Sequence, residues 1–375
     1  MSLYLDVSEF LKNPITTGIQ RIAGQLCRHM PAGAAVPVRH YRGRYVAFTS
    51  ELILAIGTYF GEPTEGNAQK IWDLGAPEIG RPIALQSSDV VLVPEVIIRA
   101  DRLDFLSQMP DREFELHRFL IYDLLPLTHP QLFWSSWMSD ICRYYKLLRK
   151  SSHCSFISEA TKHVFYRRLK RCEDVDGIVM PLGADSLGPR VSKPNLDRGL
   201  VFTVLGTIEP RKNHRLILEA FEPLLGTVPG LVLRFVGKIG WIDAEFASKV
   251  QRLGSDPASG FRLEEGCSDE QVADFVRESR ATIYVSDAEG FGLPPLESLW
   301  LGTPVIASDC IPSLERIGEA GVHVLRPADV VNLRRAVLAF CEDSYMREKI
   351  RGAISLRLPS WHSFTADMLA WCAVG

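Results

Sequence analysis

Short apolar runs alternate with stretches of helical periodicity along most of this chain. In the second half the runs lie at 200–206, 231–237, 281–286 and 304–308, and a helical pattern follows each of them. Short, continuous apolar runs are typical of strands that are buried on both faces, as the strands of parallel sheets are. The helices between them are the crossovers that parallel strands require. The second half therefore predicts an α/β domain with a parallel sheet.

The first half repeats this pattern less regularly. Its apolar runs lie at 3–7, 89–96, 118–124 and 154–158, and Pro and Gly cluster between the two series, at 180–199. A chain of 375 residues is too long for one typical domain. We therefore predict an α/β chain of two Rossmann-like domains, 1–185 and 186–357, with parallel sheets facing each other across a cleft. We expect residues 358–375 to form a helix that packs toward the N-terminal domain.

Composition narrows the functional classes. Charged residues make up 23% and hydrophobic residues 46% of the chain, and the net charge is −3. These values are typical of a globular protein and argue against a generic nucleic-acid binder. The 8 cysteines lack zinc-ligand spacing and close pairing, which favours a reducing compartment. Neither a secretory signal pattern nor a run of ~18 apolar residues is present, so we expect a cytoplasmic protein.

One segment, 286–309, combines glycines, prolines and the carboxylates of Glu289 and Glu297 with an apolar helical pattern. Pro294 and Pro295 suit the start of a helix, where a missing amide hydrogen costs little. The preceding glycines allow a ligand to approach the backbone, and a helix N-terminus stabilises an anion by about 0.3–1 kcal/mol. Glu289 precedes this helix and Glu297 lies inside it. Two interpretations are open here, a ligand site or a loop with a capping carboxylate.

A second segment, 206–221, favours the ligand site. Arg211 and Lys212 follow a buried strand directly and precede a helical pattern. Cations at the start of a helix oppose its dipole, so an anion nearby would stabilise them. Charge-assisted hydrogen bonds to a phosphate contribute about 1.5–3 kcal/mol each. In open α/β sheets such ligands bind beyond the carboxyl ends of the strands.

These two segments carry a resemblance to a known family. "EPRKNHRLILEAF" (209–221) and "EGFGLPPLESLWLGTPVIAS" (289–308) resemble the donor-binding half of the retaining GT-B glycosyltransferases of family 4, of the glycosyl transferases group 1 type. Glu289 and Glu297 match the E-x7-E motif of that family. The resemblance implies that Lys212, with Arg211, holds the donor diphosphate and that Glu297 holds the ribose hydroxyls. It further implies a donor site that includes Glu289, Gly206, Thr207, Gly237, Gly290, Phe291, Gly292 and Leu293.

The N-terminal half is similar to the same family at two places. "DVSEFLKNPITTGIQR" (6–21) resembles its first strand and glycine loop, which implies that Gly18 lies near the donor phosphates. "IYDLLPLTHPQLF" (121–133) resembles a segment that often reads His-Asp, which implies that Asp123 faces the acceptor. Tyr122 stands where that His would be. Thr207 stands where many members of the family have an Arg. Arg211 would take over the role of that Arg.

The resemblance implies transfer of a hexose, with retention, from a nucleoside diphosphate sugar to a saccharide or lipid-linked saccharide. Our first expectation for the sugar is mannose, with GDP-mannose as its donor, in bacterial polysaccharide or lipopolysaccharide biosynthesis. We expect no metal, cofactor or nucleic acid to be involved. Two alternatives stay open. A sugar-nucleotide epimerase would use a similar architecture, but it needs an acid and a base that converge on the sugar ring. A non-catalytic two-domain sugar-binding protein would also have a cleft, but it needs no diphosphate site.

Two further features have competing interpretations. Asp174 and Asp176 match an Asp-x-Asp metal pattern, but they lie in a polar segment that favours a turn. The segments 143–150 and 162–171 concentrate Lys and Arg with aromatic residues. They fit either a peripheral contact with an anionic membrane at the inner face of the cell membrane or a solvated protein surface.

Overall fold

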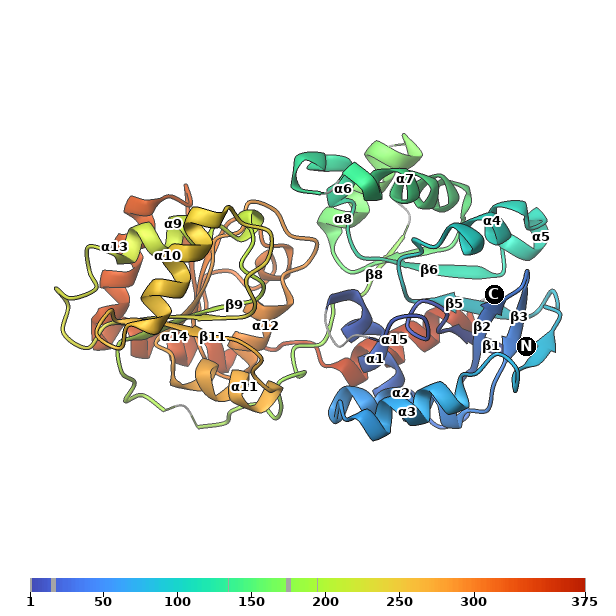
Figure 1. Cartoon of the computed structure of the whole chain (residues 1–375), viewed down its shortest axis with the longest axis horizontal. Coiled ribbons are helices and arrows are strands. Elements are labelled where there is room, and N and C mark those ends of the chain that lie inside the picture. The colour runs from blue at the N-terminus through green and yellow to red at the C-terminus, as the bar shows by residue number, and fades with distance from the viewer. Residues whose placement is uncertain (1, 15–17, 134, 173–176, 194, 375) are drawn as a thin grey trace. The chain divides into compact units, whose positions relative to one another are not determined.

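The computed structural model describes residues 2–14, 18–133, 135–172, 177–193 and 195–374. The chain divides into two compact units (Figure 1). Unit 1 comprises Met1–Gly183 and Pro359–Gly375, and unit 2 comprises Ala184–Leu358. These divisions fall within two residues of the boundaries predicted at 185 and 357, and the C-terminal segment groups with the N-terminal unit.

Unit 1 is built on a mainly parallel sheet. Within its described residues the strand order is β4-β3-β2-β1-β5-β6-β7-β8, and β3 runs antiparallel to both of its neighbours. The strands are β1 (Leu3–Asp6), β2 (Val36–Tyr41), β3 (Arg44–Ala47), β4 (Arg81–Ile83), β5 (Val90–Val93), β6 (His117–Ile121), β7 (Cys154–Phe156) and β8 (Ile178–Val179). Four of these, β1, β5, β6 and β7, confirm the predicted apolar runs.

Helices cover both faces of this sheet (Figure 1). One face carries α1 (Gly18–His29), α2 (Glu51–Gly61), α3 (Glu65–Leu74) and α15 (Trp361–Ala373). The other carries α4 (Ala100–Gln108), α5 (Asp111–Phe114), α6 (Leu125–Thr128), the 3₁₀ helix η1 (Pro130–Leu132), α7 (Ser135–Lys150), α8 (Glu159–Val164) and the π-helix η2 (Phe165–Lys170). Glycines bring α1 and α2 together, since a β-carbon on Gly57 would lie 2.8 Å from the Cα of Arg28.

Unit 2 contains a fully parallel sheet. Its strand order, over the residues that the structure describes, is β11-β10-β9-β12-β13-β14. The strands are β9 (Val201–Leu205), β10 (Val232–Val236), β11 (Phe261–Glu264), β12 (Ala281–Tyr284), β13 (Val305–Ser308) and β14 (Val322–Leu325). Read in chain order this is 3-2-1-4-5-6, the order of a doubly wound nucleotide-binding sheet. The prediction of an α/β fold with Rossmann-like domains is confirmed.

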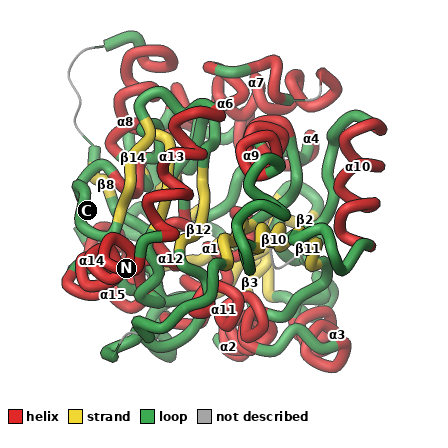
Figure 2. The backbone as a smooth tube through the Cα atoms, turned by 90° about the vertical axis from the view of Figure 1, so that its left-hand side faces the viewer, coloured by secondary structure: helices red, strands yellow, loops and turns green. Residues whose placement is uncertain are grey.

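Strands and helices alternate along most of unit 2 (Figure 2). α9 (His214–Phe221), α10 (Ala244–Ser255) and α13 (Val330–Cys341) bury one apolar core against the sheet, while α11 (Asp269–Glu278) and α12 (Leu293–Trp300) bury a second core. α14 (Asp343–Ser355) contributes Met346 to the first core and Ala353 to the second. The 3₁₀ helices η3 (Pro210–Lys212) and η4 (Pro312–Leu314) complete the unit. Both faces of the sheet are covered, which explains why its strands read as continuous apolar runs.

Candidate functional site

The strand order of unit 2 reverses between β9 and β12. These two strands pair in parallel, with Thr203 opposite Thr282, so their carboxyl ends lie at the same edge of the sheet. A reversal of strand order opens a crevice at that edge, and ligands of doubly wound folds bind there. The loop after β9 and the loop after β12 hold most of the site residues that the sequence predicts for this unit.

Two glycines shape the first loop. Gly206 follows β9 with a φ of +115°, and Gly237 follows β10 with a φ of +146°. The backbone N–H of Gly206 donates to the carbonyl oxygen of Val236 at 2.9 Å. A β-carbon on Gly237 would lie 2.3 Å from the carbonyl oxygen of Gly206, so glycine is required for this close approach. The next residue, Thr207, is half-buried.

Lys212 extends back over the end of β9 from η3. Its ammonium lies so near Gly206 that a β-carbon there would be 2.1 Å from Nζ. The side chain is half-buried. Burial lowers the pKa of Lys212, and the carboxylate of Glu289 offsets part of this effect. A cation removed from water in this way is ready to receive an anion.

Arg211, the second predicted cation, contacts protein carboxylates on both sides. Its Nη2 donates to Oε1 of Glu209 at 2.6 Å, and its Nη1 lies 2.6 Å from Oε2 of Glu289. The same Nη1 donates to the carbonyl oxygen of Ala288 at 2.8 Å. Arg211 therefore links the loop after β9 to the loop after β12.

The second loop runs into α12. Gly292, with a φ of +90°, is the N-cap residue of this helix. Pro294 and Pro295, in the first turn of α12, have no amide hydrogen and so leave no backbone donor unpaired there, as the sequence predicts. Ser313 fixes the loop by donating its hydroxyl to the carbonyl oxygen of Gly292 at 2.7 Å.

The two carboxylates of the E-x7-E motif lie at different depths. The side chain of Glu289 is 18% exposed, while Glu297, in the second turn of α12, is only 4% exposed. Burial raises the pKa of the Tyr284 phenol, and both carboxylates raise it further. Both carboxylates therefore lie near Tyr284, the last residue of β12.

The predicted residues Gly18 and Asp123 belong to unit 1. Gly18 begins α1 with a φ of +57° and is exposed. Asp123 follows β6, is half-buried and accepts a hydrogen bond from the backbone N–H of Leu125 at 3.0 Å. Tyr122 points inward, since its hydroxyl donates to the carbonyl oxygen of Pro94 and its side chain is buried. Tyr122 thus has a structural role in this unit.

Sequence reasoning assigned no role to three residues that organise the two loops. Glu209 is 5% exposed and binds Arg211. Ser286 donates its hydroxyl to Oε1 of Glu289 at 2.8 Å, and Asn213 donates its amide to the carbonyl oxygen of Val285 at 2.9 Å. A carboxylate two residues before an arginine, at the end of a buried strand, was the signal available for Glu209.

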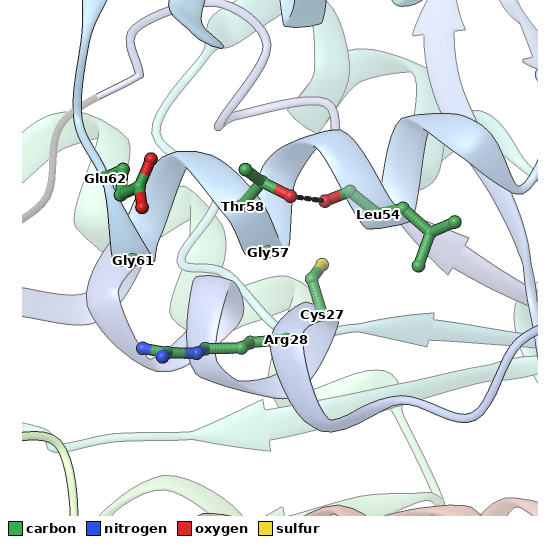
Figure 3. Close-up of a pocket in the computed structure, with 7 residues that line it drawn as sticks. All are labelled: Cys27, Arg28, Leu54, Gly57, Thr58, Gly61 and Glu62. Carbon is green, nitrogen blue, oxygen red and sulfur yellow. Dashed lines mark hydrogen bonds between the residues drawn. The ribbon is translucent and has the colours of Figure 1, made fainter. Parts of the chain in front are cut away.

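Two pockets lie elsewhere, in unit 1. One of about 350 Å³ lies between α1 and α2 (Figure 3) and is lined by Cys27, Arg28, Leu54, Gly57, Thr58, Gly61 and Glu62. The other, of about 450 Å³, is lined by residues that include His40, Asp101 and Phe105. The predicted site residues, all of which the structure describes, line neither pocket.

Among the residues that the structure describes, no group of three or more His, Cys, Asp or Glu side chains is arranged to hold a metal ion. Asp174 and Asp176 lie outside the described residues. In the same part of the chain, every helix is too short or too polar to cross a membrane.

Comparison with known sequences finds glycosyltransferases. Residues 190–355 match the family model of Glycosyl transferases group 1. The serotype-specific mannosyltransferase WbdA of Escherichia coli is 26% identical over 91% of this chain and 42% of its own length. The O-antigen chain mannosyltransferase B of E. coli is 32% identical over 44% of this chain and 43% of its own length. The chain thus spans less than half the length of these relatives.

Solved structures show the fold. HepE of Anabaena, solved in complex with UDP and glucose, superposes with a TM-score of 0.64 at 14% identity, covering 99% of each chain. Sucrose-phosphate synthase from Thermosynechococcus elongatus gives a TM-score of 0.60 at 14% identity, covering 98% of this chain and 97% of its own. This chain therefore has the GT-B fold and carries, at residues 190–355, a domain similar to Glycosyl transferases group 1.

Proposed function

We propose that this protein transfers a hexose from a nucleoside diphosphate sugar to a hydroxyl of a saccharide or lipid-linked saccharide. The observation that carries the proposal is the placement of a cation, Lys212, and a carboxylate, Glu289, in the two loops that follow β9 and β12, at the switch point of a doubly wound sheet. Doubly wound folds bind nucleotides at this point. The mannosyltransferase names of the relatives favour mannose as the sugar and bacterial polysaccharide as the product.

The chemistry asked of the site is mainly electrostatic. When the bond between the anomeric carbon and the diphosphate breaks, the diphosphate gains negative charge and the sugar becomes oxocarbenium-like. Lys212 and the backbone amides of 291–293 would stabilise the leaving diphosphate by electrostatic preorganisation. Glu289 would lie beside the sugar, and Glu297, deeper in the site, would bind the ribose hydroxyls. No cofactor takes part in this scheme.

The finer assignments follow from the family resemblance. We propose membership of family 4, retention of configuration at the anomeric carbon, and GDP-mannose as the donor. Gly18 is proposed to contribute to phosphate binding, and Asp123 to contact the acceptor. The complexes of HepE with UDP, glucose and UDP-glucose support a nucleotide sugar as the class of donor.

Incubation with nucleoside diphosphate sugars tests the proposal. Purified protein is mixed with GDP-mannose or UDP-glucose, with and without mannose oligosaccharides, and the products are followed by NMR. Transfer or slow hydrolysis of the donor supports the proposal, and the anomeric coupling of the product reports retention. Interconversion of one nucleotide sugar into another would identify an epimerase, and binding without turnover would identify a binding protein.

A thermal-shift series identifies the nucleotide. A ligand that binds the folded state alone raises stability by RT ln(1 + [L]/Kd). We expect GDP to raise the melting temperature more than UDP or ADP, and Lys212→Ala to reduce this shift. Equal shifts for all three nucleotides would leave transfer intact as a function but would reject GDP-mannose as the preferred donor.

A further inference from the structure

We propose that Glu209 is a positioning residue that fixes Arg211, and that Arg211 in turn fixes the carboxylate of Glu289. In this arrangement Arg211 orients a carboxylate, and Lys212 supplies the charge for the diphosphate. The inference rests on the proposed glycosyl transfer at this site. It assigns roles to Glu209 and Arg211 that the family resemblance does not give them.

The hydrogen bonds of the guanidinium carry the argument. An arginine has five N–H donors. Nε and Nη2 of Arg211 both donate to Oε1 of Glu209, at 3.1 and 2.6 Å. Nη1 donates to the carbonyl oxygen of Ala288 at 2.8 Å and lies 2.6 Å from Oε2 of Glu289. Four of the five donors are thus directed at protein acceptors, which leaves one for a diphosphate.

The carboxylate of Glu289 is held at both oxygens. Oε2 faces Arg211, and Oε1 accepts the hydroxyl of Ser286 at 2.8 Å. Ser286 and Glu289 both lie in the loop after β12, whereas Arg211 comes from the loop after β9. The orientation of Glu289 therefore depends on a contact from a different strand, and that contact depends on Glu209.

The burial of Glu209, Arg211 and Glu289 makes the orientation of Glu289 depend strongly on its two partners. Glu209 is 5% exposed, and the side chains of Arg211 and Glu289 are 19% and 18% exposed. Removing one partner from such a group leaves the other charges uncompensated in a poorly hydrated place. Burial lowers the pKa of Arg211, but the carboxylates of Glu289 and Glu209 outweigh this effect and hold the pKa above its usual value. Arg211 thus stays charged between the two carboxylates.

A double-mutant cycle tests the proposal. The variants are Glu209→Gln, Glu289→Gln and the double variant, with Arg215→Lys as a control because Arg215 forms an exposed ion pair with Asp243 in the same unit. We expect Glu209→Gln to lower kcat by about tenfold to a hundredfold and to leave the Kd for the nucleoside diphosphate within about twofold. The double variant should be no slower than Glu289→Gln alone, because Glu209 acts through Glu289.

A different result is expected if Glu209 only stabilises the fold. Glu209→Gln would then lower the melting temperature but leave kcat unchanged in the folded fraction, and this outcome overturns the proposal. Multiplicative losses in the double variant, or a large loss of nucleotide affinity in Arg211→Lys, overturn it as well. If Glu209→Gln fails to fold, Glu209→Asp replaces it in the test, because Asp keeps the charge on a shorter side chain. An unchanged kcat in Glu209→Asp would also overturn the proposal. Wild-type protein that consumes no nucleotide sugar overturns the proposed function itself, so the two failures are distinct.

Discussion

The ammonium of Lys212 lies against Gly206, at the place where any other residue would carry its side chain. The end of β9 is thus a glycine because a lysine from the following turn covers it. This relationship connects the strand-end glycine of the sequence directly to the charge that we assign to diphosphate binding.

Gly206→Ala should weaken nucleotide binding. The new β-carbon would lie 2.1 Å from Nζ of Lys212, so the flexible side chain must move away. We expect the Kd for a nucleoside diphosphate to rise about tenfold, or about 1.4 kcal/mol, in isothermal titration calorimetry. Gly226→Ala is the matched control, because Gly226 has a φ of +83° and open space at its β-carbon position. Gly226→Ala should lose stability and keep its affinity. Wild-type affinity in Gly206→Ala would contradict the placement of Lys212 at the diphosphate.

Glu297→Ala should raise the KM for the donor more than it lowers kcat. Hydrogen bonds to ribose hydroxyls are alike in the ground and transition states, so their loss is a loss of uniform binding. The expected cost is about 1.5–3 kcal/mol, the range for hydrogen bonds to a charged group. Steady-state kinetics measure it, with Glu297→Gln as an isosteric companion, since Glu297 is buried, and circular dichroism to check folding. A fall in kcat with unchanged KM would place Glu297 at the reacting sugar instead.

Transfer should continue without a divalent metal. Lys212 and the backbone amides before α12 already supply positive potential where the diphosphate is expected. Activity measured after treatment with EDTA should stay within about twofold of the untreated protein. Loss of activity on chelation, with recovery on adding Mn²⁺, would reject this and would direct attention to Asp174 and Asp176.

Glu95→Gln should remove a pH dependence of stability. Glu95 is 2% exposed, and burial raises its pKa from 4.5 to about 8. The folded protein therefore holds a proton that the unfolded chain releases between these two values, so stability falls as pH rises through this window, by up to about 1.4 kcal/mol per pH unit. Gln keeps an acceptor for the backbone N–H of Phe10, which Oε2 of Glu95 accepts at 2.9 Å.

Melting temperatures at pH 5 and pH 8 measure this effect. We expect Glu95→Gln to exceed wild type more at pH 8 than at pH 5. Glu348→Gln, at an exposed position of α14, controls for the loss of one negative charge. The same difference from wild type at both values of pH would show that Glu95 is ionised in the folded protein.

We propose that the basic segments 143–150 and 162–171 of unit 1 bind anionic membranes peripherally. Lys170 donates to the carbonyl oxygens of Arg149 and Ser151 at 2.8 and 2.6 Å, which ties η2 to the end of α7. Arg167 and Arg168, in η2, are exposed. Such residues contribute about 1 kcal/mol each at a negatively charged surface, and salt screens the attraction.

Flotation with liposomes tests this binding. Vesicles that contain phosphatidylserine should retain the protein at low salt and release it at high salt. Reversal of Arg167 and Arg168 to Glu should abolish retention, whereas Arg252→Glu with Arg351→Glu, at exposed positions in unit 2, should change it less. Retention by neutral vesicles to the same extent would reject an electrostatic mechanism.

The sequence predicted strands whose apolar runs are continuous or, as in β10, are interrupted by a single charged residue, Arg234. It did not predict β11, in which Arg262 and Glu264 alternate with apolar residues. It also missed the β2–β3 hairpin, because the turn residues, Arg42 and Gly43, have positive φ angles of +49° and +76°. Asn-Gly is the usual signal of such a turn, and an arginine in the first position conceals it.

Only those parts of the candidate site that lie within a single sequence motif could be predicted. The motifs located Lys212 and Glu289 at neighbouring strand ends, and the strand order of unit 2 brings those ends together. The pairing of Arg211 with Glu289 joins two loops that are distant in the chain, and no pattern within either loop specifies it. Whether a given cation is available to a ligand depends on such long-range contacts.

The division of unit 1 into two segments affects how the protein is made. α15 belongs to unit 1, where it buries Trp361, Phe364 and Met368, yet it follows all of unit 2 in the sequence. Gly183 lies directly against the start of this helix, since a β-carbon there would be 2.2 Å from the backbone nitrogen of Trp361. Domains usually fold as units and in order of synthesis. Here all of unit 2 is synthesised before unit 1 can be completed, so the apolar surface of residues up to Gly183 that α15 covers stays exposed until this helix has been made.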